Sequence, residues 1–286
     1  MTVRTALAEG TGALERSRPG SPFLDAVLLL GHALNADKAR LLSSMSDDVN
    51  PQALADYRRF IERRASGESV AYIVGFKEFY GRRYAVDPCV LVPRPDTEVL
   101  VEVALSLLPV AGGAGVPAIR CHDACTGSGC VGISIAAERP DVEVSLSDIS
   151  PGALGVARAN SCTMLGRELV ASISDILSGI TGTFDLIVAN PPYVTASLVD
   201  EIVSEGGREP RGALDGGRLG LDFYPALAAQ AFGLLRDGAA LAVEIGEEQG
   251  AEVAAILKDA GFESVKVHRD LAGSDRVVSG GKHAVR

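Results

Sequence analysis

The 286-residue sequence lacks a continuous run of about 20 apolar residues, the length that a helix needs to cross a membrane. Its longest early apolar stretch, AVLLLGHAL, is shorter and is followed by charged residues. A secretory signal pattern is also missing. We therefore expect a protein of the cytoplasm with no membrane partner.

Cysteine is scarce, and its spacing does not suggest a site. The five cysteines are Cys89, Cys121, Cys125, Cys130 and Cys162. An odd number without a secretory signal indicates reduced thiols. The three cysteines between positions 121 and 130 lack the C-x2-C pairs of zinc sites, and His122 is the only histidine near them. Small buried side chains explain them better, so we expect no metal.

Basic residues are outnumbered, with 27 Lys and Arg against 37 Asp and Glu, a formal net charge of -10. Non-specific binding of nucleic acid needs a basic face, so direct nucleic-acid partners are not expected, although a local basic groove is not excluded. Hydrophobic residues make up 47% of the chain, enough for a sizeable core. No internal repeat is visible in the sequence. We also expect a monomer.

Residues 1–70 have helical patterns. The stretch SPFLDAVLLLGHALN offers Ser21 as a cap, then a proline, then apolar residues at helical spacing. The stretch NPQALADYRRFIERRASG repeats this design, with Asn50 as the cap and arginines near the end. We interpret residues 1–70 as a small all-α bundle.

Residues 71–93 are rich in aromatic and branched side chains and predict a β-hairpin linker. Residues 94–286 form the second domain. It opens with a helix in RPDTEVLVEVALSLL, for which Thr97 or Asp96 is the predicted cap.

Strands and helices then alternate. The predicted strands are 118–122, 142–146, 184–189, 239–244, 264–268 and 276–279, with a weaker one at 169–173. The predicted helices are 129–138, 151–165, 224–235 and 248–260. This order is typical of a Rossmann-like α/β fold, a parallel sheet covered by helices on both faces. Ligands of such sheets bind beyond the carboxyl ends of the strands.

The first loop at such a strand end is HDACTGSGCVGISIA, in which Gly127, Gly129 and Gly132 fit G-x-G-x-x-G. Glycines let the backbone approach a ligand closely before a helix. The pattern fits a nicotinamide cofactor, S-adenosylmethionine or a close-packed turn without a ligand. Asp148 follows the next strand and could accept both ribose hydroxyls or cap the following helix. Asp175 could accept from an adenine amino group or be an ordinary loop carboxylate.

The stretch FDLIVANPPYVT ends a strand with Asn190, Pro191, Pro192 and Tyr193. Proline holds the preceding residue extended and donates no hydrogen bond, so the nearby carbonyls are left for a ligand. Asn190 adds a side-chain carbonyl, and Tyr193 offers a flat face for stacking. Two acceptors at a fixed separation suit a planar NH2 group, which a simple Pro-Pro loop would not require.

Asn-Pro-Pro-Tyr at this place resembles the signature of S-adenosylmethionine-dependent methyltransferases that act on planar or amide nitrogen. Together with AYIVGFKEFYG, VLVPRPDTEVLVE, EPRGALDGGRLGLDFY, VEIGEEQG and DLAGSDRVV, it makes nearly the whole chain similar to the protein-(glutamine-N5) methyltransferases of peptide chain release factors. The resemblance implies a class I methyltransferase fold. It also implies methyl transfer to the glutamine of the Gly-Gly-Gln motif in release factors. Since an inert amide needs remote binding energy, we also expect the helical domain to dock that substrate.

The resemblance also implies the site. The methionine part of S-adenosylmethionine falls on Cys125, Thr126, Gly127, Ser128 and Gly129. The ribose falls on Asp148, the adenine on Asp175 and Ile176, and Asn190 lies beside the cofactor. The glutamine amide falls on Asn190, Pro191, Pro192 and Tyr193, of which Asn190, Pro191 and Tyr193 are the expected catalytic residues. The family usually has glycine in place of Cys125 and often has an aromatic residue in place of Ile176.

Four other functions remain open. A ribosomal-protein glutamine methyltransferase and an adenine-N6 nucleic-acid methyltransferase would share the Asn-Pro-Pro-Tyr chemistry, but the acidic charge disfavours the second. An NAD-dependent oxidoreductase would leave Asn190 to Tyr193 unexplained. A non-catalytic binding module finds support only in Cys125.

Overall fold

The computed structural model describes residues 1–17, 20–110 and 118–283. Two compact units make up the chain. One is Met1–Phe76 with Glu201–Arg208, and the other is Lys77–Asp200 with Glu209–Arg286. Among the described residues, no helix combines the length and the apolar character needed to cross a membrane.

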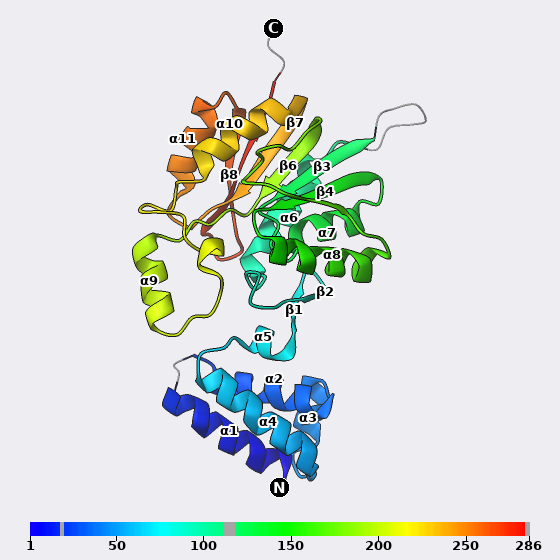
Figure 1. Cartoon of the computed structure of the whole chain (residues 1–286), viewed down its shortest axis with the longest axis vertical. Coiled ribbons are helices and arrows are strands. Elements are labelled where there is room, and N and C mark those ends of the chain that lie inside the picture. Colours follow the sequence, from blue (N-terminus) through cyan, green and yellow to red (C-terminus); the bar gives the residue numbers. More distant parts are fainter. Residues whose placement is uncertain (18–19, 111–117, 284–286) are drawn as a thin grey trace. The chain divides into compact units, whose positions relative to one another are not determined.

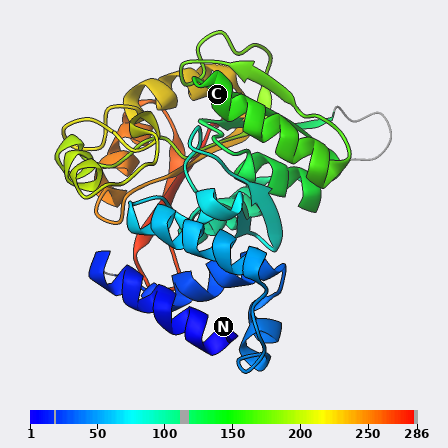
Figure 2. The same cartoon turned by 60° about the horizontal axis from the view of Figure 1, so that its bottom comes forward.

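The first unit is helical, as the sequence predicts (Figure 1). Its helices are α1 (Val3–Ser17), α2 (Pro22–Leu34), α3 (Lys38–Ser43), α4 (Pro51–Ala65) and α5 (Val70–Val74). Helices α1, α2 and α4 contact one another and lie side by side in both views (Figure 2). Leu7, Leu29 and Tyr57 are buried between them and belong to one apolar core.

The helix starts of the first unit were predicted with mixed success. Asn50 caps α4, since its Oδ1 accepts from the Ala53 amide at 2.8 Å, and this prediction is confirmed. Ser21 stands before α2, but its side chain accepts no capping hydrogen bond, so the predicted side-chain cap is wrong. The backbone carbonyl of Ser21 accepts from the Asp25 amide instead, as in an ordinary first turn.

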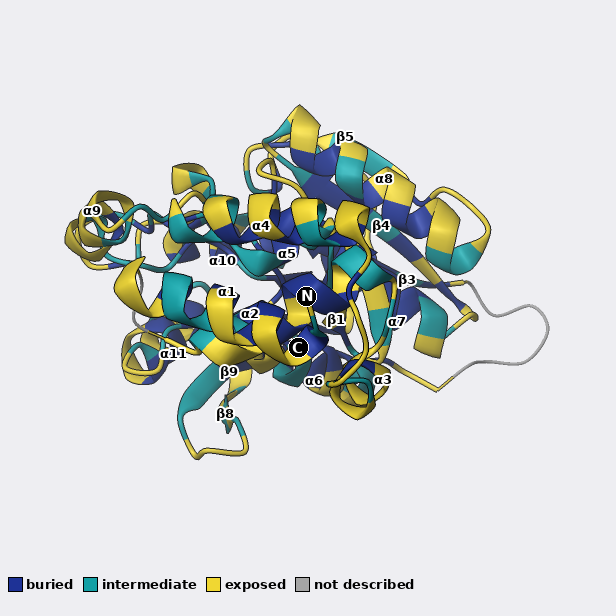
Figure 3. Cartoon of the chain, turned by 90° about the horizontal axis from the view of Figure 1, so that it is seen from below, coloured by how far each residue is buried: buried dark blue, intermediate teal, exposed yellow. Residues whose placement is uncertain are grey.

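Helix α9 (Ala196–Ser204) was not predicted. Val199 is its one buried residue, and Figure 3 shows the helix largely in the exposed colour. Leu198, Val199 and Ile202 recur at helical spacing, so a periodic signal was available in the sequence. The segment Glu201–Arg208, which begins within α9, belongs to the first unit, where Arg208 donates to the carbonyl and the hydroxyl of Ser66 at 3.1 and 3.0 Å.

The predicted linker contains a hairpin, β1 (Phe76–Phe79) and β2 (Arg82–Ala85). Tyr80 and Gly81 join the strands with φ of 48° and 69°, the two positive angles of a tight hairpin turn. The expected range began too early, because α5 occupies Val70–Val74. Ser69 caps that helix, accepting from Tyr72 at 3.2 Å, which overrides the strand preference of its branched and aromatic side chains.

The second unit is the α/β part. Its strands are β3 (Ile119–Ala124), β4 (Val142–Asp148), β5 (Val170–Ile173), β6 (Phe184–Ala189), β7 (Leu235–Glu244), β8 (Glu263–Arg269) and β9 (Asp275–Gly281). Its helices are α6 (Glu98–Leu107), α7 (Cys130–Glu138), α8 (Pro151–Leu165), α10 (Tyr224–Leu234) and α11 (Gly250–Asp259), with short 3-10 turns η1 (Pro95–Thr97) and η2 (Arg211–Ala213).

The strands form one sheet in the order β5-β4-β3-β6-β7-β9-β8. Neighbours from β5 to β7 are parallel, as predicted, but β9 runs antiparallel to β7 and β8. The prediction of a parallel sheet is therefore wrong at this end. The segment 270–274 between β8 and β9 is too short for the crossover helix that a parallel pair would need.

Helices cover both faces of the sheet (Figure 1). Helices α6, α7 and α8 contact one face, where Leu100 and Ile133 are fully buried. Helices α10 and α11 contact the other face through a second apolar core that includes Leu227 and Val253. The hairpin is fixed to this unit by Asn160 of α8, which accepts from the Ala85 amide at 2.8 Å.

Candidate active site

The strands that carry the predicted site residues end next to one another. Ala124, the last residue of β3, is paired with Ser147 of β4 and with Ala189 of β6. On the far side of β4, Asp148 is paired with Ile173 of β5. The loops after these strands therefore meet at one edge of the sheet, where ligands of such folds bind.

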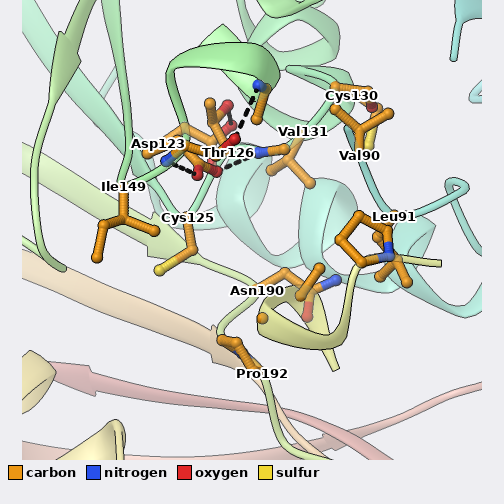
Figure 4. Close-up of a pocket in the computed structure, with 18 of the residues that line it drawn as sticks. Val90, Leu91, Asp123, Cys125, Thr126, Cys130, Val131, Ile149, Asn190 and Pro192 are labelled. Carbon is orange, nitrogen blue, oxygen red and sulfur yellow. Dashed lines mark hydrogen bonds between the residues drawn. The ribbon is translucent and has the colours of Figure 1, made fainter. Parts of the chain in front are cut away.

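A cavity of about 360 Å³ lies at this edge, within the size range of small-molecule sites (Figure 4). It brings together most of the predicted site residues. Those that line it are Cys125, Thr126, Gly127, Ser128, Asp148, Asp175, Ile176, Asn190 and Pro192. Figure 4 shows Cys125 between Ile149 and Asn190, with Pro192 beside Asn190.

Three predicted residues do not line the cavity, namely Gly129, Pro191 and Tyr193. Gly129 has a packing role, because a Cβ there would lie 2.6 Å from Ile133 and 3.2 Å from Ala157. It lets α7 and α8 approach each other behind the turn. Pro191 is buried, directly next to the lining residues of its own segment.

Asp123, which is buried near the end of β3, holds the glycine-rich turn in place through hydrogen bonds. Its Oδ2 accepts from the Thr126 hydroxyl at 2.6 Å and from the Gly132 amide at 2.9 Å. Burial raises the pKa of Asp123 to about 7, although both hydrogen bonds act in the opposite direction. Gly132 must be glycine, because a Cβ would lie 2.5 Å from Leu146.

Cys125 opens the turn in the left-handed region, with φ of 55°. A side chain with a Cβ is strained there, which explains why glycine suits this position. Burial, and then the charge of Asp148, raise the pKa of the Cys125 thiol to about 12. The thiol is therefore a neutral part of the cavity wall, not a nucleophile.

Asp148 connects the turn to the next loop. Its Oδ2 accepts from the Gly127 amide and its Oδ1 from the Ser150 amide, both at 2.9 Å. It does not cap α8, because Ser150 does so by accepting from Ala153 at 3.2 Å. Each carboxylate oxygen keeps a second lone pair for a ligand. Burial raises the pKa of Asp148.

Part of the cavity wall is apolar. Ile176 lines it with φ of 55°, a second strained position, next to Asp175. Ile149 also lines the cavity and is 65% exposed, yet the sequence reasoning did not single it out. An apolar residue directly after Asp148, in an otherwise polar loop, was the available signal. Backbone strain of this kind concentrates at functional sites.

Asn190 also lines the cavity. Its side-chain amide donates to the Thr97 hydroxyl at 3.4 Å. Thr97 is buried and lines the cavity, and its side chain does not cap α6, so the predicted capping role is wrong. The hydroxyl is turned toward Asn190 instead.

Tyr193, which was predicted to offer a stacking face, does not line the cavity. It packs against the apolar core beneath α10 and α11, and its hydroxyl donates to Glu244 Oε1 at 3.1 Å. Glu244 ends β7 and is fully buried. Burial raises the pKa of Glu244 to about 7. The sequence reasoning missed Glu244, whose signal was a carboxylate closing the apolar run of β7.

The outer wall of the cavity comes from two separate segments of the second unit. Leu91, Pro93 and Arg94 come from one, and η2 contributes Gly212 and Ala213. Glu209 joins the two segments, because it accepts from the Val92 amide at 3.0 Å and pairs with Arg94. These residues were recognised only within the matching stretches VLVPRPDTEVLVE and EPRGALDGGRLGLDFY.

His122 is part of β3 and does not line the cavity. It is buried on β3 between the hydroxyls of Ser145 and Ser147, at 2.8 and 2.9 Å. Burial lowers the pKa of His122 to about 4, which keeps the ring neutral. Within residues 1–17, 20–110 and 118–283, no group of three or more His, Cys, Asp or Glu side chains could hold a metal ion.

Comparison with known proteins agrees with this geometry. Residues 5–75 match the family model described as PrmC N-terminal domain, and residues 105–214 match the model described as Methyltransferase small domain. A crystal structure of a methyltransferase from Pyrococcus furiosus has a TM-score of 0.52 at 20% identity, covering 72% of this chain and 91% of that one. This likeness supports the methyltransferase fold.

Curated relatives match nearly the whole chain. The release factor glutamine methyltransferase of Moorella thermoacetica is 38% identical over 279 residues, which cover 96% of this chain and 97% of that protein. The release factor glutamine methyltransferase of Bordetella pertussis is 40% identical, covering 92% of this chain and 96% of that protein. The chain therefore belongs to the family of release factor glutamine methyltransferases.

Proposed function

We propose that this protein transfers a methyl group from S-adenosylmethionine to the side-chain nitrogen, N5, of the glutamine in the Gly-Gly-Gln motif of peptide chain release factors. The observation that carries the proposal is the position of Asn190. It shares one cavity with the glycine-rich turn and Asp148, so groups suited to an amide and groups suited to a nucleoside line the same space.

The cavity residues fit the cofactor. Gly127 can approach it closely, since nothing lies within 4 Å of a Cβ built there. Asp148 would accept the ribose hydroxyls with its remaining lone pairs. Asp175 and Ile176, with Ile149, would surround the adenine, and Cys125 to Ser128 would face the methionine part. When bound, S-adenosylmethionine supplies an electrophilic methyl group.

The protein's task is to prepare a poor nucleophile. The lone pair of a glutamine amide nitrogen is delocalised into its carbonyl. The side-chain oxygen of Asn190 accepts one amide hydrogen, and a backbone carbonyl of the Asn-Pro-Pro segment accepts the other. Both bonds concentrate electron density on the nitrogen and hold it in line with the methyl group. Positioning of this kind supplies up to ~7–11 kcal/mol in favourable systems.

No strong general base is required. The methylated nitrogen carries a positive charge and is acidic, so its proton leaves after the transfer. His122 cannot accept it, because its ring is enclosed between two serines. The apolar walls from Leu91, Pro93 and Pro192 exclude water from the reacting atoms.

The reaction is tested by incubating the protein with a release factor and isotopically labelled S-adenosylmethionine, followed by mass mapping. The label is expected on the glutamine of Gly-Gly-Gln. A release factor with Asn in place of that glutamine is the matched control and should stay unlabelled. Label on another residue, on a ribosomal protein alone or on nucleic acid would refute the assignment.

We propose further that the helical domain docks the release factor. Leu24 and Leu28 lie one turn apart on α2 and are 41% and 43% exposed, with Phe23 beside them. An inert amide needs remote binding energy to be held in line, and a protein surface supplies more of it than one glutamine.

We also propose that the enzyme works as a monomer in the cytoplasm without direct nucleic-acid contact. The net charge of -10 supports the absence of nucleic-acid contact.

Docking predicts different effects on protein and peptide substrates. Leu24→Ser with Leu28→Ser should lower transfer to an intact release factor by at least ~10-fold, or ~1.4 kcal/mol of transition-state binding. Transfer to a short Gly-Gly-Gln peptide should change far less. Leu42→Ser on α3, also exposed, is the control and should change neither. Equal loss with both substrates would contradict docking.

A further inference from the structure

The reaction described above leaves Glu244 without a role, although its position is unusual. The carboxyl group is 0% exposed at the carboxyl end of β7. Tyr193 donates to Oε1 at 3.1 Å, whereas Oε2 is buried and has no hydrogen-bond partner among the described residues. Such a group costs stability, so a function is the better explanation for its presence.

Thr97 lies between Glu244 and Asn190. Its Oγ1 accepts from the side-chain nitrogen of Asn190 at 3.4 Å. The same hydroxyl is close enough to the Glu244 carboxylate to favour its charged form, although the geometry does not complete a hydrogen bond to Oε2. A hydroxyl has a single hydrogen. Because its oxygen accepts from Asn190, that hydrogen is available for the Glu244 carboxylate, which can only accept.

This chain of groups has a direction. An ionised carboxylate fixes the hydroxyl as a donor toward itself, and the hydroxyl oxygen then favours the NH2 group of Asn190 as its neighbour. The carbonyl oxygen of Asn190 is thereby left for the substrate. With the opposite orientation, two NH2 groups would face each other and the acceptor would be lost.

We propose that Glu244 and Thr97 are positioning residues that orient the Asn190 side chain so that its oxygen faces the substrate amide. The proposal rests on the proposed function, since it assumes that Asn190 receives an amide. The Asn190 bond is long at 3.4 Å, and catalytic hydrogen bonds of this kind shorten when a substrate is bound. Tyr193 holds Oε1 and ties the end of the Asn-Pro-Pro-Tyr segment to the same carboxylate.

Charged and titratable groups reach Glu244 from several elements. Arg276 on β9 favours the ionised carboxylate, and Asp96 on η1 opposes it. Tyr193 and Tyr224, and Cys130 on α7, also lie within its electrostatic reach. Orientation by an ionised Glu244 requires kcat to fall as the pH drops through the pKa of Glu244, which burial places near neutrality.

The test compares Thr97→Val, which keeps the shape and removes the hydroxyl, with Thr97→Ser, which restores the hydroxyl, and with Glu244→Gln. We expect Thr97→Val and Glu244→Gln to lower kcat at least tenfold and to abolish the acidic limb of the kcat–pH profile. The dissociation constant of S-adenosylmethionine should change less than threefold. Thr97→Ser should recover most of kcat and the acidic limb.

Several results would overturn the positioning roles. These are a wild-type kcat for Thr97→Val, a Thr97→Ser variant as slow as Thr97→Val, or an unchanged acidic limb in Glu244→Gln. Thermal unfolding and cofactor binding show whether each variant is folded. Recovery of kcat in Thr97→Ser shows that the loss in Thr97→Val comes from the missing hydroxyl. A wild-type protein that does not methylate a release factor would overturn the proposed function itself, which is a separate and earlier readout.

Discussion

Replacement of Asp148 by alanine tests the cofactor end of the cavity. The carboxylate already accepts from Gly127 and Ser150 at 2.9 Å, so it is fixed before a ligand arrives. Hydrogen bonds to a charged group contribute roughly 1.5–3 kcal/mol. Loss of the ribose bonds should therefore weaken S-adenosylmethionine binding by about 12-fold to 150-fold, since each 1.4 kcal/mol is tenfold.

Isothermal calorimetry with S-adenosylmethionine measures this change directly. Asp141→Ala is the control, because Asp141 lies just before the opposite end of β4 and pairs with Arg139 at the surface. It removes the same charge and should leave the affinity within twofold. An unchanged affinity in Asp148→Ala would show that the carboxylate only holds the two loops together.

The affinity of the wild-type protein for S-adenosylmethionine should also weaken toward acidic pH, beginning above the ordinary pKa range of aspartate, because burial raises the pKa of Asp148.

Three further predictions concern Asn190, the core of the first unit and the buried Glu244. Asn190→Ala should abolish methyl transfer while calorimetry shows cofactor affinity within about tenfold, or ~1.4 kcal/mol, and a wild-type rate would refute the amide-binding role. Gly10→Ala should lower the free energy of unfolding by ~1–3 kcal/mol in denaturant titrations, because its Cβ would lie 1.9 Å from the Tyr57 hydroxyl, whereas Gly12→Ala on the same helix meets only Arg16 at 3.7 Å and should not destabilise. Glu244→Gln should become more stable than wild type as the pH rises from about 4.5 to above 7, by up to ~3 kcal/mol. In the folded wild type the pKa of Glu244 is about 7, against an ordinary value of 4.5. Protonation of Glu244 therefore stabilises the folded wild type fully below pH 4.5, and this stabilisation is lost as the pH rises through about 7. Glutamine does not titrate, so the variant loses nothing over the same range. A pH-independent difference would contradict the raised pKa.

Local patterns were enough to predict most of the fold. Strand β6 and helix α8 have the predicted bounds, because a proline pair ends the first and Pro151 with a capping serine begins the second. The antiparallel direction of β9 was not predicted, since the positions of strands along the chain do not show in which direction each strand runs in the sheet. The helix α5 was hidden by side chains that favour strands, and only its Ser69 cap opposed them.

The candidate site shows the same division. Residues that directly follow strands, such as Asp148 and Asn190, could be found because parallel strands bring their loops to one edge. Thr97 and Glu244 were missed, because their importance depends on a neighbour more than 50 residues away in the chain. Thr97 in particular resembled a helix cap, and only the fold shows that its hydroxyl is used elsewhere.

The chain passes between the two units three times, after Phe76, after Asp200 and after Arg208. During synthesis, α1 to α5 are complete long before Glu201–Arg208 is made, so the first unit must first fold without its last segment. A protease that cuts after Phe76 would not at once release the N-terminal fragment, because Arg208 still holds Ser66 through two hydrogen bonds. Exchange of helical units between relatives, by recombination or by design, therefore has to move two separate pieces of sequence together.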